Sequence, residues 1–450
     1  MSQTQTTTTN RDLRGHLEHA PMTAYQWAIV AIAVLLNAND GFDVAAMSFV
    51  SLGVETEFGL TGSELGTVIS ATLIGMAIGA FAIGRLADIV GRRWTVVGSA
   101  VVSTVGMFLA SSSADVVQLG VWRVLTGLGV GGILASITVI TAEYSNRRWR
   151  GFAIGLYTAG YGVGAFLGGI AANGLQEGYG WRAVFLVGAS VSVLIVIALA
   201  LIVPESVQFL VARRPAYADR ALRGIAKRVG FDPERASLDA SGGSGAHETG
   251  ASRIGDLFRG RMLLVTVLIW AAFFTVMFGF YFVNSWTPRL MVEAGMTAQQ
   301  GVYIGMALAI GGAVGSVLYG LVAVRVSRER ALVGFLVLTA IAIVVFVLST
   351  AVLTVAFVLG VVTGLLVNGC IAGLYSVAPA RYGTATRATG VGAALAVGRV
   401  GAIFAPIAGG ALLDLGWSTF ALYASTAALL LVGAVVTVAL GWIPGSDDGD

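Results

Sequence analysis

The chain has 450 residues, of which 56% are hydrophobic and only 11% are charged, and its formal net charge is +3. This composition lies outside the range of soluble globular proteins and predicts an all-α polytopic membrane protein. The 61 glycines fit this class, because small residues let helix backbones approach closely in lipid. The single cysteine, Cys370, excludes an intrachain disulfide.

The first 23 residues are polar, and an apolar run follows at residues 24–50. This run has the length of a membrane-spanning helix and is too long for a cleaved signal peptide. It nevertheless contains Asn37, Asp40 and Asp43. Because the two acids are three residues apart, they project from one face of a helix, with Asn37 on the same stripe.

Each acid inside a span costs roughly 2.5 to 3.5 kcal/mol on insertion scales, so the pair indicates a function. Such acids line a water-filled path, pair with a basic group or carry protons, and the structural alternative is an ion pair that only fixes helix packing. The sequence contains no metal-ligand cluster, catalytic grouping or phosphate-binding loop. It therefore predicts no enzyme, no cofactor and no metal.

Uncharged runs predict twelve membrane spans in two sets of six. The first set covers residues 25–50, 65–83, 94–111, 116–141, 152–174 and 183–203. The second set covers residues 262–286, 302–324, 331–349, 352–378, 386–412 and 417–442. The predicted organisation is a tail at 1–23, a six-helix bundle at 24–204, a central loop at 205–261, a second bundle at 262–443 and a tail at 444–450.

The basic residues predict the orientation. Of the 27 Lys and Arg residues, 23 fall in segments on one side of these spans. By the positive-inside rule that side is the cytoplasm, so both termini are expected there and nucleic-acid binding is not implied. Two of the other four, Arg123 and Arg399, fall inside spans.

The central loop divides the spans six and six, with a predicted surface helix at 216–229 and a flexible linker at 240–245. The two halves resemble each other at an offset of 236 to 237 residues. Arg150 then corresponds to Arg387, and Trp181 to Trp417. Paired halves with a site at their interface near the midplane are a recurrent design of transporters.

The loop after the second span carries Gly84, Asp88, Gly91, Arg92 and Arg93 in the sequence GRLADIVGRR. It resembles the loop signature of the major facilitator superfamily. An acid and arginines at helix ends can pair across neighbouring helices and close a gate in one state. The predicted gating residues are Asp88, Arg92, Arg93, Glu143, Arg147, Arg150 and Arg387. In the second half Val324 replaces Asp88, so the second gate is expected to be degenerate.

Within the superfamily, the chain resembles the aromatic acid:proton symporters. The first span carries their Asp-Gly-aromatic-Asp pattern at residues 40–43. The segments at 182–185, 204–206, 285–288, 387–392 and 398–401 are also similar. The resemblance covers nearly the whole chain apart from the tails and the linker, although the Pro-Glu-Ser and Trp-Arg segments also occur in sugar and organic-cation relatives.

The charged and aromatic residues inside the spans are consistent with a proton-coupled carboxylate transporter. Arg123 and Asp43 lie at the same depth in their spans, since an α-helix rises about 1.5 Å per residue, and an ion pair is the simplest way to bury both. Asp40 and Asp43 are the candidates for proton coupling, because burial favours their protonated forms and Arg123 their ionised forms. Arg399 is expected to bind a substrate carboxylate through its planar fork, or else to pair with a helix carbonyl or an acid. Further candidates for substrate contact are Arg123, Phe42, Tyr157, Tyr161, Phe278, Tyr281, Trp286 and Tyr375.

The sequence thus predicts a symporter that imports a small aromatic carboxylate with protons by alternating access across a bacterial cytoplasmic membrane. We expect its partners to be the substrate, protons and the lipid bilayer, and the unit to be a monomer. The alternatives are an importer of a sugar or another organic acid, and an efflux antiporter. Paired acids and intramembrane arginines favour an anion, whereas a neutral sugar needs hydroxyl and amide partners.

Overall fold

The computed structural model describes residues 13–232, 254–383 and 386–443. Within these ranges, twelve helices are long and apolar enough to cross a membrane, as the sequence predicts. The first six are α2 (Ala24–Phe58), α3 (Gly62–Val90), α4 (Arg92–Ser111), α5 (Val116–Glu143), α6 (Arg150–Tyr179) and α7 (Trp181–Ile202). The second six are α10 (Gly260–Glu293), α11 (Ala298–Ala323), α12 (Arg328–Leu348), α13 (Leu353–Arg381), α14 (Arg387–Asp414) and α15 (Thr419–Gly441). The predicted linker and the predicted C-terminal tail lie outside the described residues.

Several helix starts follow from their first residues. Thr23, Thr61 and Thr297 each form a capping box with a Gln or Glu three residues later, which satisfies free backbone N–H groups at the helix start. Eleven of the twelve helices are longer than the predicted spans, whereas α15 is shorter than the predicted 417–442. The 35 residues of α2 correspond to about 52 Å, against a hydrocarbon core of about 30 Å. For the longest helices, such as α2 and α10, the sequence predicted only the apolar part.

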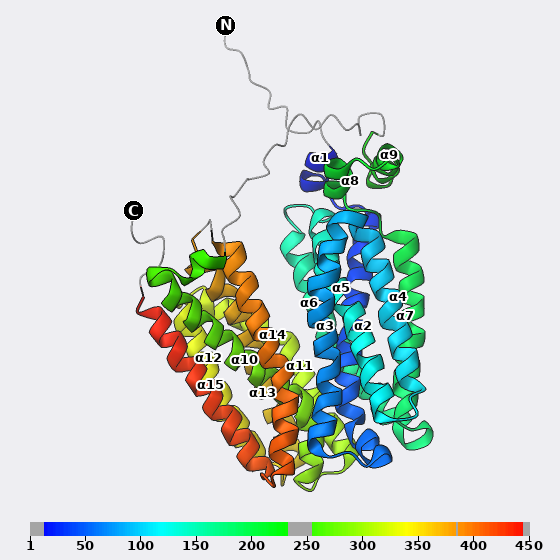
Figure 1. Cartoon of the computed structure of the whole chain (residues 1–450). Helices are drawn as coiled ribbons and strands as arrows, with labels where there is room; N and C mark the ends of the chain where they lie inside the picture. The colour runs from blue at the N-terminus through cyan, green and yellow to red at the C-terminus, as the bar shows by residue number, and fades with distance from the viewer. Residues whose placement is uncertain (1–12, 233–253, 384–385, 444–450) are drawn as a thin grey trace.

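Three short helices cover one end of the first half (Figure 1). They are α1 (Leu13–His19), α8 (Val207–Arg213) and α9 (Ala218–Val229), and α9 is the predicted surface helix. Their apolar residues pack together, with Leu13 and Leu17 of α1 in one buried cluster with Leu222 and Ile225 of α9. The sequence analysis missed α1 and α8, because seven residues are too few to show a helical period. We call this the basic end, and the opposite end the closed end.

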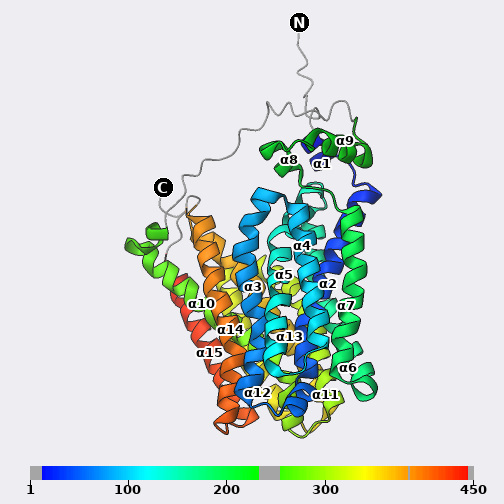
Figure 2. The ribbon, with the colours of Figure 1, turned by 45° about the vertical axis from the view of Figure 1, so that its right-hand side comes forward.

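The two six-helix halves stand side by side and diverge toward the basic end (Figures 1 and 2). Their contacts run between α3 and α14, between α6 and α11, and between α2 and α10. Among the described residues, each hydrogen bond or ion pair between the halves lies in the part of these helices toward the closed end. The interface is therefore closed at one end and open at the other.

Within the first half, α2 and α6 pack backbone against backbone through glycines. A Cβ atom on Gly41 would overlap the carbonyl of Tyr161, and a Cβ atom on Gly164 would overlap the carbonyl of Ala38. Small residues permit this approach in lipid, where van der Waals contact drives helix association. The packing holds the polar stripe of α2 at a fixed position against α6.

This packing predicts the effect of adding one methyl group to α6. Gly164→Ala should destabilise the protein by about 1 to 3 kcal/mol, because no side chain nearby can give way to the new atom. Gly155→Ala in the same helix is the control, since a Cβ atom there meets nothing within 4 Å. Thermal unfolding in detergent measures the difference, and equal melting temperatures would contradict the packing argument.

Candidate functional site

A buried ion pair joins α2 and α5, as the common depth of the two residues predicts. Arg123 donates from Nη1 to Asp43 Oδ1 at 2.5 Å and from Nη2 to the Asp43 carbonyl at 3.2 Å. Both side chains are 1% exposed, and the guanidinium also lies over the ring of Phe185. Removing one partner of such a pair strands the other charge in the interior.

Asp40 lies one turn before Asp43 in a different setting. It is 5% exposed, and within the described parts of the chain its carboxylate forms no ion pair and its Oδ1 is buried without a hydrogen-bond partner. The charges that act on it most strongly are those of Asp43, Arg399 and Arg123. Asp43 is therefore compensated within its own half, whereas Asp40 is an acid without a direct partner.

Arg399 of α14 lies where the two halves meet. Its charge acts on Asp40 and Tyr161 of the first half and on Tyr281 and Tyr375 of the second. Its side chain is half-buried, and within the described residues its guanidinium has no hydrogen-bond partner. Five helices, α2, α6, α10, α13 and α14, thus place one cation, one acid and three tyrosines in one cluster, which we call the central site.

Apolar side chains of both halves pack beside the central site. Leu73, Met76 and Val130 of the first half form a buried cluster with Ala402 of the second, and Tyr281 packs against it. Ala402 follows Arg399 by three residues on α14, one turn nearer to the closed end. The cluster offers an apolar surface against which a ring could lie.

Four of the predicted aromatic residues lie near the charged groups. Tyr161 and Tyr281 are half-buried, and Tyr375 is 48% exposed with its ring against Phe273. Tyr157 is close enough to Asp40 to feel its charge, and its backbone carbonyl accepts a hydrogen bond from Asn37 at 2.7 Å. The hydroxyl of Tyr157 is buried without a partner in the described chain.

The other three predicted aromatic residues pack against other groups. The ring of Phe42 lies against Gly188 of α7 inside the first half. Trp286 is 1% exposed and donates from Nε1 to the carbonyl of Pro406 at 3.1 Å, which packs α10 against α14. Phe278 is partly buried and packs beside Phe274 on its own helix, and its contact with substrate stays a prediction.

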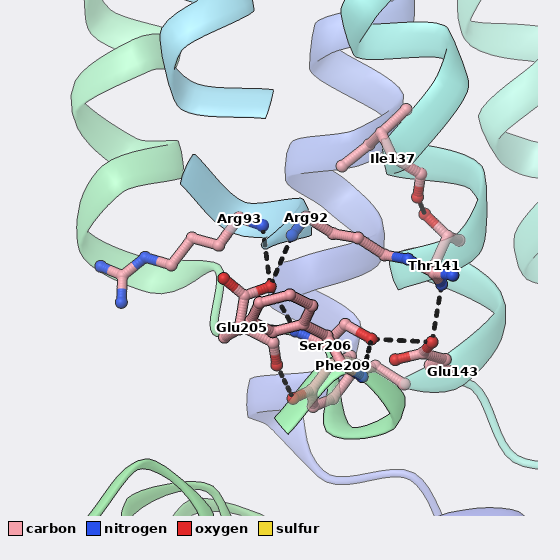
Figure 3. A network of polar contacts seen from close by, with 9 residues as sticks. Arg92, Arg93, Ile137, Thr141, Glu143, Glu205, Ser206 and Phe209 are labelled. Atoms are coloured by element: carbon pink, nitrogen blue, oxygen red, sulfur yellow. Dashed lines mark hydrogen bonds and ion pairs between the residues drawn. The ribbon is translucent and has the colours of Figure 1, made fainter. Parts of the chain in front are cut away.

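A second polar cluster lies at the basic end of the first half (Figure 3). Arg92 at the start of α4 pairs with Glu143 at the end of α5 at 2.9 Å, and the Ser206 hydroxyl also donates to Glu143. Glu205 accepts from the backbone N–H groups of Arg92 and Arg93 at 2.8 and 3.0 Å. The predicted pairing between neighbouring helices is present here, within one half. Glu205 and Ser206 were missed as site residues, although the Pro-Glu-Ser motif directly after a span was a signal for them.

The remaining predicted gating residues have no carboxylate–arginine pairing in the described chain. The backbone carbonyl of Asp88 accepts from Arg213, while Arg150 and Arg387 donate to backbone carbonyls near their own helix starts. The backbone N–H of Arg147 donates to Glu18. The structure thus shows these four residues in contacts with the backbone only.

The second half contains an ion pair between helix ends that its loop sequence does not predict. Glu329 in the first turn of α12 pairs with Arg381 at the end of α13 at 2.7 Å. These helices correspond to α4 and α5, so the ion pair occupies the place of Arg92 and Glu143 with the charges exchanged. The expectation of a degenerate second gate is wrong in this respect. The loop lost its acid at Val324, but the ion pair between the helix ends is kept.

The fold and the paired halves define a class of membrane transporter, and comparison with known proteins identifies the family. The model of the Major Facilitator Superfamily matches residues 30–348, and the chain belongs to this family. The chain is 32% identical to the 4-hydroxybenzoate transporter of Pseudomonas putida, over 94% of this chain and 95% of that protein. It is 30% identical to the gallate transporter of Pseudomonas putida, over 90% and 89%, and 30% identical to the 3-(3-hydroxy-phenyl)propionate transporter of Escherichia coli, over 91% and 93%.

Solved structures agree on the fold. The xylose transporter XylE of Escherichia coli superposes with a TM-score of 0.72 at 17% sequence identity, over 94% of this chain and 99% of that chain. A bacterial homologue of the lysosomal transporter Spinster gives a TM-score of 0.71 at 17% identity, over 94% and 100%. The chain is a multi-pass membrane transporter.

The buried ion pair makes a prediction about stability. Asp43→Ala and Arg123→Ala should each destabilise the protein by roughly 3 to 5 kcal/mol, and the double variant by less than the sum, because each single change strands a buried charge. The control is the pair between Glu57 and Arg182 at the closed end, whose side chains are 43% and 34% exposed. Its removal should cost at most about 1 kcal/mol. Thermal unfolding of the full set in detergent measures these changes, and additive effects of Asp43→Ala and Arg123→Ala would contradict direct coupling.

Proposed function

We propose that this transporter imports a small aromatic carboxylate together with protons across the bacterial cytoplasmic membrane. The observation that carries the proposal is the central site, where Arg399 lies within electrostatic range of Asp40 and of three tyrosines. A guanidinium presents the planar donor pair that a carboxylate accepts, and tyrosine rings offer stacking surfaces with a polar group. The names of the relatives agree, since hydroxybenzoate, gallate and hydroxyphenylpropionate are all aromatic carboxylates.

The proposed orientation places the basic end in the cytoplasm, together with both termini. The bias of Lys and Arg supports it, because 23 of the 27 fall in segments on that side. With this orientation the end at which the halves diverge faces the cytoplasm, and the end that carries the polar contacts between them faces outside. The structure then corresponds to the inward-facing state of an alternating-access cycle.

In this proposal, the binding of substrate and the binding of a proton are coupled because Arg399 lies close to Asp40 and also binds the substrate carboxylate. A substrate carboxylate on Arg399 offsets the positive charge that otherwise favours the ionised form of Asp40, so anion and proton favour each other's binding. Asp43 shares the polar face but is held by Arg123, and we propose that it fixes the field around Asp40 and takes part in coupling. Both halves of the site come from one chain, so we propose that a monomer is sufficient.

Uptake into proteoliposomes tests the function directly. Labelled 4-hydroxybenzoate should accumulate under an inward proton gradient, a protonophore should abolish the accumulation, and aromatic acids but not glucose should compete. Folded protein that takes up no acid of the panel would contradict the substrate class, and accumulation that persists with the protonophore would contradict proton coupling. Competition by glucose would favour the sugar alternative, and proton-driven movement outward would favour export.

Asp40→Asn separates coupling from binding. The amide cannot take up and release a proton, so gradient-driven accumulation should fall to background, whereas exchange of labelled for unlabelled substrate should continue. Asp43→Asn should also abolish accumulation. The control is Asp115→Asn, which changes an exposed acid at the closed end. Full gradient-driven accumulation in Asp40→Asn and Asp43→Asn would exclude these residues from the proton path.

Arg399→Lys tests the carboxylate site. Lysine keeps the charge but loses the two-point geometry, so the half-saturation concentration for uptake should rise by about tenfold or more. Arg182→Lys at the closed end provides the same chemical change outside the central site. An unchanged half-saturation concentration in Arg399→Lys would remove this residue from the substrate site.

A further inference from the structure

Two groups of polar contacts join the halves at the outermost turns of the closed end, and neither belongs to the central site. One further hydrogen bond, from the Ser70 hydroxyl to the carbonyl of Ile403, lies deeper between α3 and α14. The first joins α2 to α10: Arg289 donates to both carboxylate oxygens of Glu55, at 2.5 and 2.9 Å. The two side chains are 19% and 23% exposed, and Glu293 lies 3.5 Å from the same guanidinium on its own helix. This ion pair joins the two halves and is partly exposed to solvent.

The second contact joins α14 to α3. The carboxylate of Asp414 accepts from the backbone N–H groups of Gly62 and Ser63, at 2.7 and 2.8 Å, and from the Ser63 hydroxyl. These N–H groups lie in the first turn of α3, where a helix has donors without a partner and a partial positive charge. A carboxylate of one half thus caps a helix of the other half. The backbones meet closely here, since a Cβ atom on Gly66 would overlap the carbonyl of Pro406.

The third contact between the halves is of another kind. Between α6 and α11, Gly169 faces the side chain of Met306, and Gly162 faces Ala309 and Ala313. The described residues of these two helices form no hydrogen bond or ion pair with each other. The contact between α6 and α11 therefore consists of apolar packing alone. The other two contacts, of α2 with α10 and of α3 with α14, also contain ion pairs or hydrogen bonds.

We propose that Glu55, Arg289 and Asp414 form the gate that holds the closed end shut while the central site is open at the basic end. All three groups must change partner when the halves separate at this end. Their exposure makes the exchange possible, because partly exposed ion pairs and caps contribute little and water can replace each partner. A cavity of about 420 Å³ at this end is lined by Arg289 together with Glu57, Phe49 and Pro288, so the pair borders a cavity on its Arg289 side. The buried pair of Asp43 and Arg123 lies within one half and can remain intact.

The experiment measures opening of the closed end without any substrate. In a Cys370→Ala background, Met306→Cys places a thiol in the apolar contact, away from both polar contacts. Intact cells are treated with a membrane-impermeant maleimide, and the rate of labelling is compared between variants. Glu55→Gln and Asp414→Ala should each raise this rate about three- to tenfold, the shift expected from losing one exposed ion pair or cap. The double variant should raise it further.

Two matched controls keep the test specific. Glu57→Gln removes an acid two residues away on α2 whose partner, Arg182, is in the same half. Asp115→Ala removes a helix cap within the first half, on α5. Neither control should change the labelling rate. Equal labelling in all variants, or an increase as large in the controls, would overturn the gate.

The test rests on the proposed orientation, which a separate thiol checks. Ser112→Cys is exposed in a loop at the closed end and must be labelled in intact cells if that end faces outside. The labelling of Met306→Cys reports on an outer gate only if Ser112→Cys is also labelled. The labelling assay does not depend on which solute the protein carries. Absence of labelling at Ser112→Cys would therefore overturn the orientation and the gate as an outer gate, but not the central site.

A crosslink gives a prediction of the opposite sign. The side chains of Ser63 and Asp414 meet across the interface, so a Ser63→Cys and Asp414→Cys double variant can form a disulfide there. The oxidised protein should lose uptake and labelling of the inserted thiol at position 306, and reductant should restore both. Uptake that is unaffected by complete crosslinking would show that the halves need not separate at this contact, and would overturn the proposal.

Discussion

The cost of placing charge inside an apolar helical bundle is the constraint on which this structure depends. Asp43 and Arg123 reduce this cost by forming an ion pair within the first half, where both side chains are 1% exposed. Asp40 and Arg399 lie in different halves and have no direct partner in the described chain. The charge of Arg399 acts on Asp40 across the interface, in addition to that of Arg123 within the first half, so the electrostatics of the central site depend on how the halves meet.

Backbone-to-backbone packing at glycines occurs within the halves and also between them, where Gly62 of α3 meets Gly410 of α14. Inside the first half, α2 and α6 touch backbone to backbone at Gly41 and Gly164, and such contacts leave no room for sliding. Between the halves, the polar contacts at Glu55 and Asp414 are few and lie near water. Polar contacts that water can replace, confined to one end of the interface, suit two bodies that rock against each other around a site.

The ion pairs at the basic end show how internal symmetry survives a change of residues. Arg92 and Glu143 join the third and fourth helices of the first half, and Glu329 and Arg381 join the equivalent helices of the second. A comparison of the two loops residue by residue finds Val324 in place of Asp88 and misses the pair. What is kept is attraction between two helix ends, and exchanging both charges preserves it.

The sequence by itself determined the twelve spans, the acids in the first span and the pairing of Asp43 with Arg123, because these depend on span length and on depth along a helix. Only the tertiary structure decided which aromatic residues lie near Arg399, since helices that are apolar on every side carry no periodicity that tells one face from another. It turned Phe42 toward α7 and buried Trp286 between α10 and α14. It also joined Glu55 to Arg289 and Asp414 to α3, contacts between residues more than 230 positions apart that no local pattern in the chain encodes.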